Sequence, residues 1–248
     1  MADLLRGLVS RFLPQPQADN AQDVVRISRY REVDVVPRVT KQHPLADEGS
    51  YYVANNSQTG ILIPAATAFL ATTPALVVAN TDSPGNASAK RIYLDYVSLD
   101  LSAVGSVTSP ALAAAVVLDV GNRYASGGTA LTPVMPNMDL GPKSVAQVFF
   151  GAVTATAATA SARTAVGQRY LLAGVAYAVG DSWVLNFGGV AENRAAFIGT
   201  PPVPSGFVIP LPPVIVGPGQ SALVYLWEPG STVTTAPSML PDVGWWER

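Results

Sequence analysis

The sequence predicts an all-β fold, an antiparallel β-sandwich of the jelly-roll type preceded by an extended N-terminal arm. Short apolar runs recur along residues 51–227, which is the pattern of strands in a sandwich. Glycine and proline, 21 residues of each, fall between these runs as turn residues do. The chain has 248 residues, and a sandwich of that length can form a single domain.

The first 48 residues form the predicted arm, which holds 14 of the 32 charged side chains of the chain. A short helix is expected at its start, because five apolar residues fall on one helical face: Leu4, Leu5, Leu8, Val9 and Phe12. Pro14 and Pro16 end this helix. A polar linker follows, and residues 24–40 favour an extended arm or an edge strand because they contain Pro37. We expect the helix to dock on a neighbouring subunit; the alternative is that it folds back on its own body.

Residues 49–248 form the predicted sandwich body. Its clearest strand is RIYLDYVSLDLSAV, in which Ile92, Leu94 and Tyr96 share one face. Strands are expected at 51–54, 60–63, 75–79, 91–104, 111–119, 146–153, 169–179, 183–187, 214–216 and 222–227.

Two other segments of the body have weaker patterns. Residues 154–163 are rich in alanine and threonine, so either a weak helix or an exposed loop is expected. The segment PPVPSGFVIPLPP is expected to cross the surface irregularly, because proline cannot donate to a strand ladder.

The C-terminal residues are expected to form an extended tail containing Trp245 and Trp246. Adjacent strand residues point to opposite faces, so one ring would cover the body while the other meets a partner. Both tryptophans are therefore candidate partner-contact residues, as are Leu4, Leu5, Leu8 and Phe12 in the arm. The alternative is that both rings close the end of the core.

The composition favours a protein that contacts partners. Only 13% of the residues are charged and 49% are hydrophobic, so much of the surface is expected to lie against other subunits. Alanine on an ordinary surface is the alternative explanation. The net charge of −2 gives no general attraction to nucleic acid, and no apolar run of about 18 residues could span a membrane.

We expect no enzymatic activity, no metal site and no cofactor. The chain lacks cysteine, and its one histidine, His43, stands beside a proline in the arm. Gly180-Asp181-Ser182 resembles the nucleophile block of the GDSL hydrolases, but no histidine follows it, so a turn is expected. Residues 217–220 lack the lysine and the helix of a phosphate-binding loop and are expected to form a turn.

The blocks PPVIVGPGQSALVYLWEP and GWWER, with RIYLDYVSLDL and GNRYASGGT, resemble small proteins encoded among the virion genes of tailed bacteriophages. The resemblance covers most of residues 51–248 and includes no active-site motif. It implies a jelly-roll capsid decoration or cement protein that forms a homo-oligomer, commonly a trimer, on the major capsid protein. A neck or tail component that contacts other virion proteins is the alternative.

The resemblance also implies a location in the virion after synthesis in the host cytoplasm. A further alternative is a carbohydrate-binding module for host recognition, with Trp183, Trp227, Trp245 or Trp246 as the stacking platform.

Overall fold

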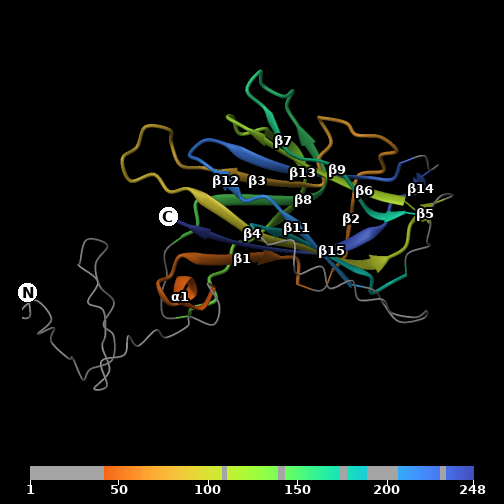
Figure 1. Cartoon of the computed structure of the whole chain (residues 1–248), viewed down its shortest axis with the longest axis horizontal. Helices are drawn as coiled ribbons and strands as arrows, with labels where there is room; N and C mark the ends of the chain where they lie inside the picture. Colours follow the sequence, from red (N-terminus) through yellow and green to blue (C-terminus); the bar gives the residue numbers. More distant parts are fainter. Residues whose placement is uncertain are drawn as a thin grey trace, which may run out of the picture. The chain divides into compact units, whose positions relative to one another are not determined.

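The computed structural model describes residues 42–57, 59–107, 111–138, 143–173, 178–188, 206–229 and 233–248 (Figure 1). These residues are predominantly in β-strands, so the all-β prediction is confirmed. Leu4, Leu5, Leu8 and Phe12 lie outside the described residues.

The first sheet has the strand order β1-β15-β4-β10-β11. Two short strands complete it: β2 pairs with β15, and β12 pairs with β4. All neighbours are antiparallel except β10 and β11, which are parallel. The strands are β1 (Tyr51–Asn55), β2 (Ile61–Leu62), β4 (Ile92–Ala103), β10 (Ser182–Phe187), β11 (Gly206–Leu211), β12 (Val214–Val216) and β15 (Ser238–Glu247).

The second sheet has the strand order β7-β8-β3-β13-β6-β9, and all its neighbours are antiparallel. Its strands are β3 (Leu76–Asn80), β6 (Ala111–Asp119), β7 (Tyr124–Leu131), β8 (Ala146–Ala155), β9 (Arg163–Ala173) and β13 (Ser221–Trp227). A helix, α1 (Gln42–Asp47), precedes β1, and β5 (Ser106–Val107) pairs with β14 (Val233–Thr235).

One apolar core lies between the two sheets. Alternate residues of the strands point into it, as the pleat of a strand requires. The first sheet contributes among others Tyr52, Leu94, Val97, Leu99, Trp183 and Trp245, and the second contributes Leu76, Val78, Leu112, Val116, Phe150 and Val224.

The outer face of the second sheet is also apolar and buried. Every residue of β13 is buried, and its outward side chains form a second cluster with residues of β3, β6 and β8. Part of the cover comes from the segment between β2 and β3, where Phe69 packs 4.7 Å from the ring of Tyr225 and 5.8 Å from that of Trp227. This second cluster explains why β6 and β13 are almost continuously hydrophobic.

Most expected strands are present with shifted ends, and those at 111–119 and 214–216 match to the residue. β9 begins at Arg163 rather than at 169. Residues 156–162 are a connection between β8 and β9, so the loop alternative is correct for them.

The sequence did not predict α1, β5, β7 or β14. Residues 206–211 form β11, so the prediction that PPVPSGFVIPLPP crosses the surface irregularly is wrong for them. β7 contains Gly127 and Gly128, both at positive φ, and glycines of this kind are typical of turns.

The expected C-terminal tail is instead the strand β15, which lies between β1 and β4 at the middle of the first sheet. The prediction of an extended tail outside the sheets is therefore wrong. Pro241 is tolerated there for a local reason. β1 pairs with residues 242–246 and β2 with residues 238 and 239, so neither strand pairs with Pro241 on that side of β15.

Candidate partner-contact surfaces

Trp245 and Trp246 point to opposite sides of the first sheet. Trp245 is fully buried, stacks on Tyr52 at 6.1 Å between ring centroids, and donates from Nε1 to Glu247. Its assignment as a partner-contact residue is corrected, because a side chain in the core offers no surface. Trp246 is half-buried on the outer face and stacks parallel to Tyr93 at 5.4 Å.

Three of the four tryptophans therefore offer no stacking platform for a sugar. Trp183 and Trp245 have no exposed surface, and Trp227 is 4% exposed. Among the tryptophans only Trp246 could meet a ligand.

Two tyrosines cover Gly244 on the outer face of the first sheet. Tyr51 donates to Asp95 at 3.1 Å, and Tyr96 donates to Oδ2 of Asp242 at 3.2 Å. A Cβ on Gly244 would lie 2.7 Å from the hydroxyl of Tyr51 and would also overlap the ring of Tyr96. Glycine at this position lets both rings approach the backbone of β15.

Burial shifts the pKa values of Tyr51, Tyr96 and Asp242. It raises the pKa of both Tyr51 and Tyr96 well above their usual range, and the nearby carboxylates add to the effect. Burial also raises the pKa of Asp242, and the charge of Asp100 acts in the same direction. Within the described fold no group donates to Oδ1 of Asp242.

Glu247 joins β15 to the segment before β8. Its buried carboxylate accepts from the hydroxyl of Ser144 and from the backbone of Val145, and Lys90 lies 3.7 Å away. Burial and, to a smaller extent, the charge of Glu247 raise the pKa of Tyr52 to about 12. This carboxylate therefore holds one end of the fold together.

Arg123 ties loops to the outer face of the second sheet. Its guanidinium is 1% exposed and donates to the carbonyls of Ala71 and Thr156 and to the hydroxyl of Tyr225. The carboxylate of Asp119 lies 3.6 Å from Nε.

Asp119 is itself held by several donors. Burial raises its pKa, but hydrogen bonds from Thr159 and Gly121 and the charge of Arg123 outweigh burial and hold the pKa below its usual range. Asp119 and Arg123 are thus a buried ion pair with a structural function, and neither was singled out from the sequence.

Three apolar side chains, two in the loop between β2 and β3 and one in β9, are exposed. Phe69 is 44% exposed, Leu70 53% and Tyr170 58%. We call these three residues the apolar seat. The signal in the sequence was the apolar pair Phe69-Leu70 between turn residues, but a loop does not reveal which face it covers.

The two segments that resemble a nucleophile block and a phosphate-binding loop are turns, as expected. Gly180 is in a turn at positive φ, and the carboxylate of Asp181 accepts from the backbone of Ala178 at 2.8 Å. Ser182 starts β10 and pairs with Asp100. Residues 217–220 turn into β13, with the side chain of Gln220 accepting from the backbone of Gly217.

The described residues contain no group of three or more histidine, cysteine, aspartate or glutamate side chains that could hold a metal ion. No helix among them is long and apolar enough to cross a membrane. Comparisons with models of protein families, with curated proteins and with solved structures find no match for the chain.

Proposed function

We propose that the chain is a non-enzymatic structural protein of a bacteriophage virion that decorates and stabilises the capsid, and that its fold is a jelly roll. One observation carries the fold assignment. Eight strands pair as in a long antiparallel hairpin that has been rolled up into two sheets. In the order of the chain, these strands are β1, β3, β4, β6, β9, β10, β13 and β15.

In this order the first strand pairs with the eighth, β1 with β15, and the second with the seventh, β3 with β13. The third pairs with the sixth, β4 with β10, and the fourth with the fifth, β6 with β9. The double-sheet jelly roll is a common architecture of viral capsid domains, so the pairing supports a virion role by analogy of fold. β7 and β8 are then a hairpin inserted between the fourth and fifth strands.

The use of the buried polar groups also supports a structural role. Arg123, Asp119 and Glu247 are each satisfied by groups of the fold itself, where they join loops to strands. The apolar seat, in contrast, exposes apolar side chains to solvent. Exposed apolar side chains suit permanent contacts with other subunits, because permanent interfaces are more apolar than transient ones.

We further propose that the N-terminal arm supplies part of this contact, with Leu4, Leu5, Leu8 and Phe12 docking on a neighbouring subunit. Contacts repeated over a symmetric shell reinforce one another, so a modest contact in each copy is sufficient. A homo-oligomer such as a trimer and the major capsid protein are the proposed partners.

The copy number of the chain in purified virions tests this proposal. Quantitative gel densitometry should find many copies, in a fixed ratio to the major capsid protein. Copies sufficient for only one ring would point to the neck or tail alternative. Absence from virions would overturn the virion role altogether.

A second measurement tests the arm. Removal of residues 1–20 should lower the occupancy of the chain on mature capsids. In a control protein that carries an added, unrelated tag of the same length, removal of the tag should leave the occupancy unchanged. Unchanged occupancy would show that the arm is not an anchor.

A further inference from the structure

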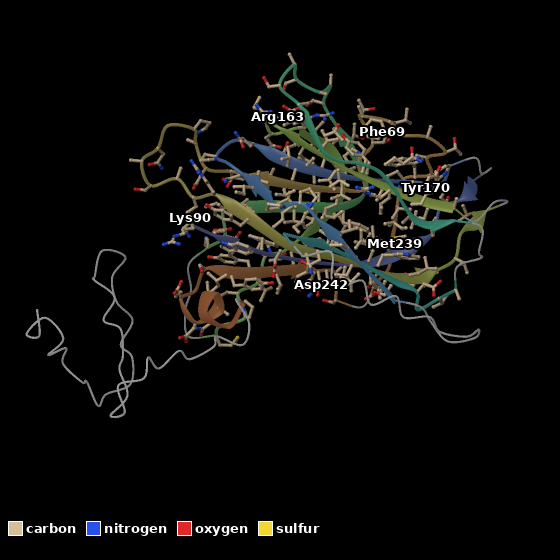
Figure 2. The ribbon with its side chains drawn as sticks, in the orientation of Figure 1. Phe69, Lys90, Arg163, Tyr170, Met239 and Asp242 are labelled. Carbon is tan, nitrogen blue, oxygen red and sulfur yellow. The ribbon has the colours of Figure 1, made fainter. Side chains whose placement is uncertain are left out.

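Two side chains of the apolar seat, Phe69 and Tyr170, lie over one row of paired residues. The ring of Phe69 packs edge-on against Trp227, and Trp227 pairs in register with Ala113 of β6. Ala113 pairs in turn with Tyr170 of β9, so Trp227, Ala113 and Tyr170 follow one another across three strands. Residues paired across antiparallel strands point to the same face. Phe69 and Tyr170 therefore lie on the same outer face, as Figure 2 shows.

The loop that carries Phe69 and Leu70 is held in place at several points. The carbonyl of Ala66 accepts from the backbone of Glu228, and that of Thr72 from Ala155. The guanidinium of Arg123 holds the carbonyl of Ala71 at 2.6 Å. An apolar surface that is already ordered loses little conformational entropy when a partner binds.

The chemistry of the seat selects an apolar partner. Residues 61–81 contain no charged side chain. The exposed fractions of the three side chains amount to roughly 300 Å² if each presents about 200 Å² in full. A stable interface between two folded bodies needs about 800 Å² from each partner, so the seat is suited to a short segment instead.

The chain carries such a segment outside the described residues. The apolar face predicted from the sequence at residues 4–12 has the chemistry and the size of the seat. About 30 residues lie between Phe12 and α1. At about 3.3 Å per residue they could extend to roughly 100 Å, which is enough to reach a neighbouring copy.

We infer that the apolar seat of one copy receives Leu4, Leu5, Leu8 and Phe12 of a neighbouring copy. This inference rests on the arm function proposed above and names the surface that the arm contacts. Each copy would then bind one neighbour through its own arm and bind the arm of another copy at its apolar seat.

Cysteine pairing tests the inference directly, because the natural chain has no cysteine. One full-length chain carries Leu8→Cys and a second carries Leu70→Cys. When the two are mixed and mildly oxidised, we expect a disulfide-linked heterodimer. The matched control replaces Leu70→Cys by Ile215→Cys, which is 45% exposed on the first sheet. A yield no higher than in this control would overturn the seat.

The double substitution Phe69→Ser with Leu70→Ser provides the second readout. Self-association measured by analytical ultracentrifugation should fall. Because Phe69 also packs on Tyr225 and Trp227, the thermal melting temperature should fall as well, while unfolding stays cooperative. Tyr170→Ser is the independent variant should the double variant misfold. Unchanged self-association of a folded seat variant counts against the inference.

The two proposals fail in different ways. If removal of residues 1–20 lowers capsid occupancy but the Leu8 and Leu70 positions do not crosslink above the control, the arm has another receiving surface. If they crosslink but the chain is absent from virions, the seat is correct and the virion function is wrong.

Discussion

Two adjacent tryptophans have different surroundings because a strand turns successive side chains to opposite faces. Trp245 fills the core beside Tyr52, and Trp246 lies half-buried on the outer face against Tyr93. The pattern GWWER was sufficient to predict that the rings point apart, but not that the strand carrying them is central.

We expect Trp245→Ala to lower the free energy of unfolding by about 3–5 kcal/mol, because it leaves a large cavity in the core. Trp246→Ala should cost only about 1 kcal/mol, mainly through loss of the stack on Tyr93. Urea denaturation of both variants, followed by far-UV circular dichroism, measures the difference. Equal losses would contradict the opposite placement of the two rings.

Asp242 is expected to make stability depend on pH. Its pKa is raised in the folded state, so the folded state favours the protonated carboxyl. This contribution is fully present below the unfolded pKa and is lost as the pH rises through the folded pKa.

Asp242→Asn should therefore be more favourable to stability at neutral pH than at acidic pH, each compared with the natural chain at the same pH. Urea denaturation at a series of pH values between about 3 and 7 tests this. Asp47→Asn, at an exposed position, is the control. A difference between natural chain and variant that does not change with pH would contradict the raised pKa.

At the scale of elements, Arg123 connects the segment before β3, the segment after β8 and strand β13. Removing one partner of a buried ion pair leaves the other charge uncompensated. We expect Arg123→Met to destabilise the fold by about 3–5 kcal/mol in urea denaturation.

The matched control for that prediction is Arg163→Met, because Arg163 is exposed at the start of β9 (Figure 2). It should change the free energy of unfolding by less than about 0.5 kcal/mol. If both variants lose the same stability, the bonds of Arg123 do not support the loops.

The elements differed in how far they could be predicted from sequence. The ends of β4 and β6 were predicted well, because apolar residues alternate or run continuously between clear turns. The faces of β4 were predicted only in part. Ile92 and Leu94 point into the core, but a register shift turns Tyr96 to the outer face, so the prediction that all three share one face is wrong.

β7 was missed since Gly127 and Gly128 are typical of turns, yet here both residues continue an edge strand across a bulge. Proline concealed β11, which tolerates Pro210 because it is at the edge of its sheet.

The candidate surface was the part least accessible from sequence. Phe69 and Tyr170 are about one hundred residues apart, and only the register of β13, β6 and β9 brings them to one face. Arg123 and Asp119 are only four residues apart, but the carbonyls of Ala71 and Thr156 that Arg123 also binds come from distant loops. A single sequence carries no signal for contacts of this range.

For the whole molecule, the sheet order predicts where the backbone opens. Amide hydrogens of β4, β6, β13 and β15 should exchange slowest, because these strands have a neighbour on each side. Those of β7 and β11, at the sheet edges, should exchange fastest. Hydrogen exchange followed by mass spectrometry measures both, and fast exchange in β15 would show that it is a peripheral tail after all.

The position of β15 also has a consequence for biosynthesis. β1 and β4 are complete long before β15 leaves the ribosome, yet β15 is the strand that lies between them. Until then the facing edges of β1 and β4 have no strand to pair with, and their apolar side chains are less well covered. Unpaired strand edges of this kind are prone to aggregation. Folding of this protein must therefore finish after translation has passed residue 247, and the cell's chaperones are expected to meet it before that point.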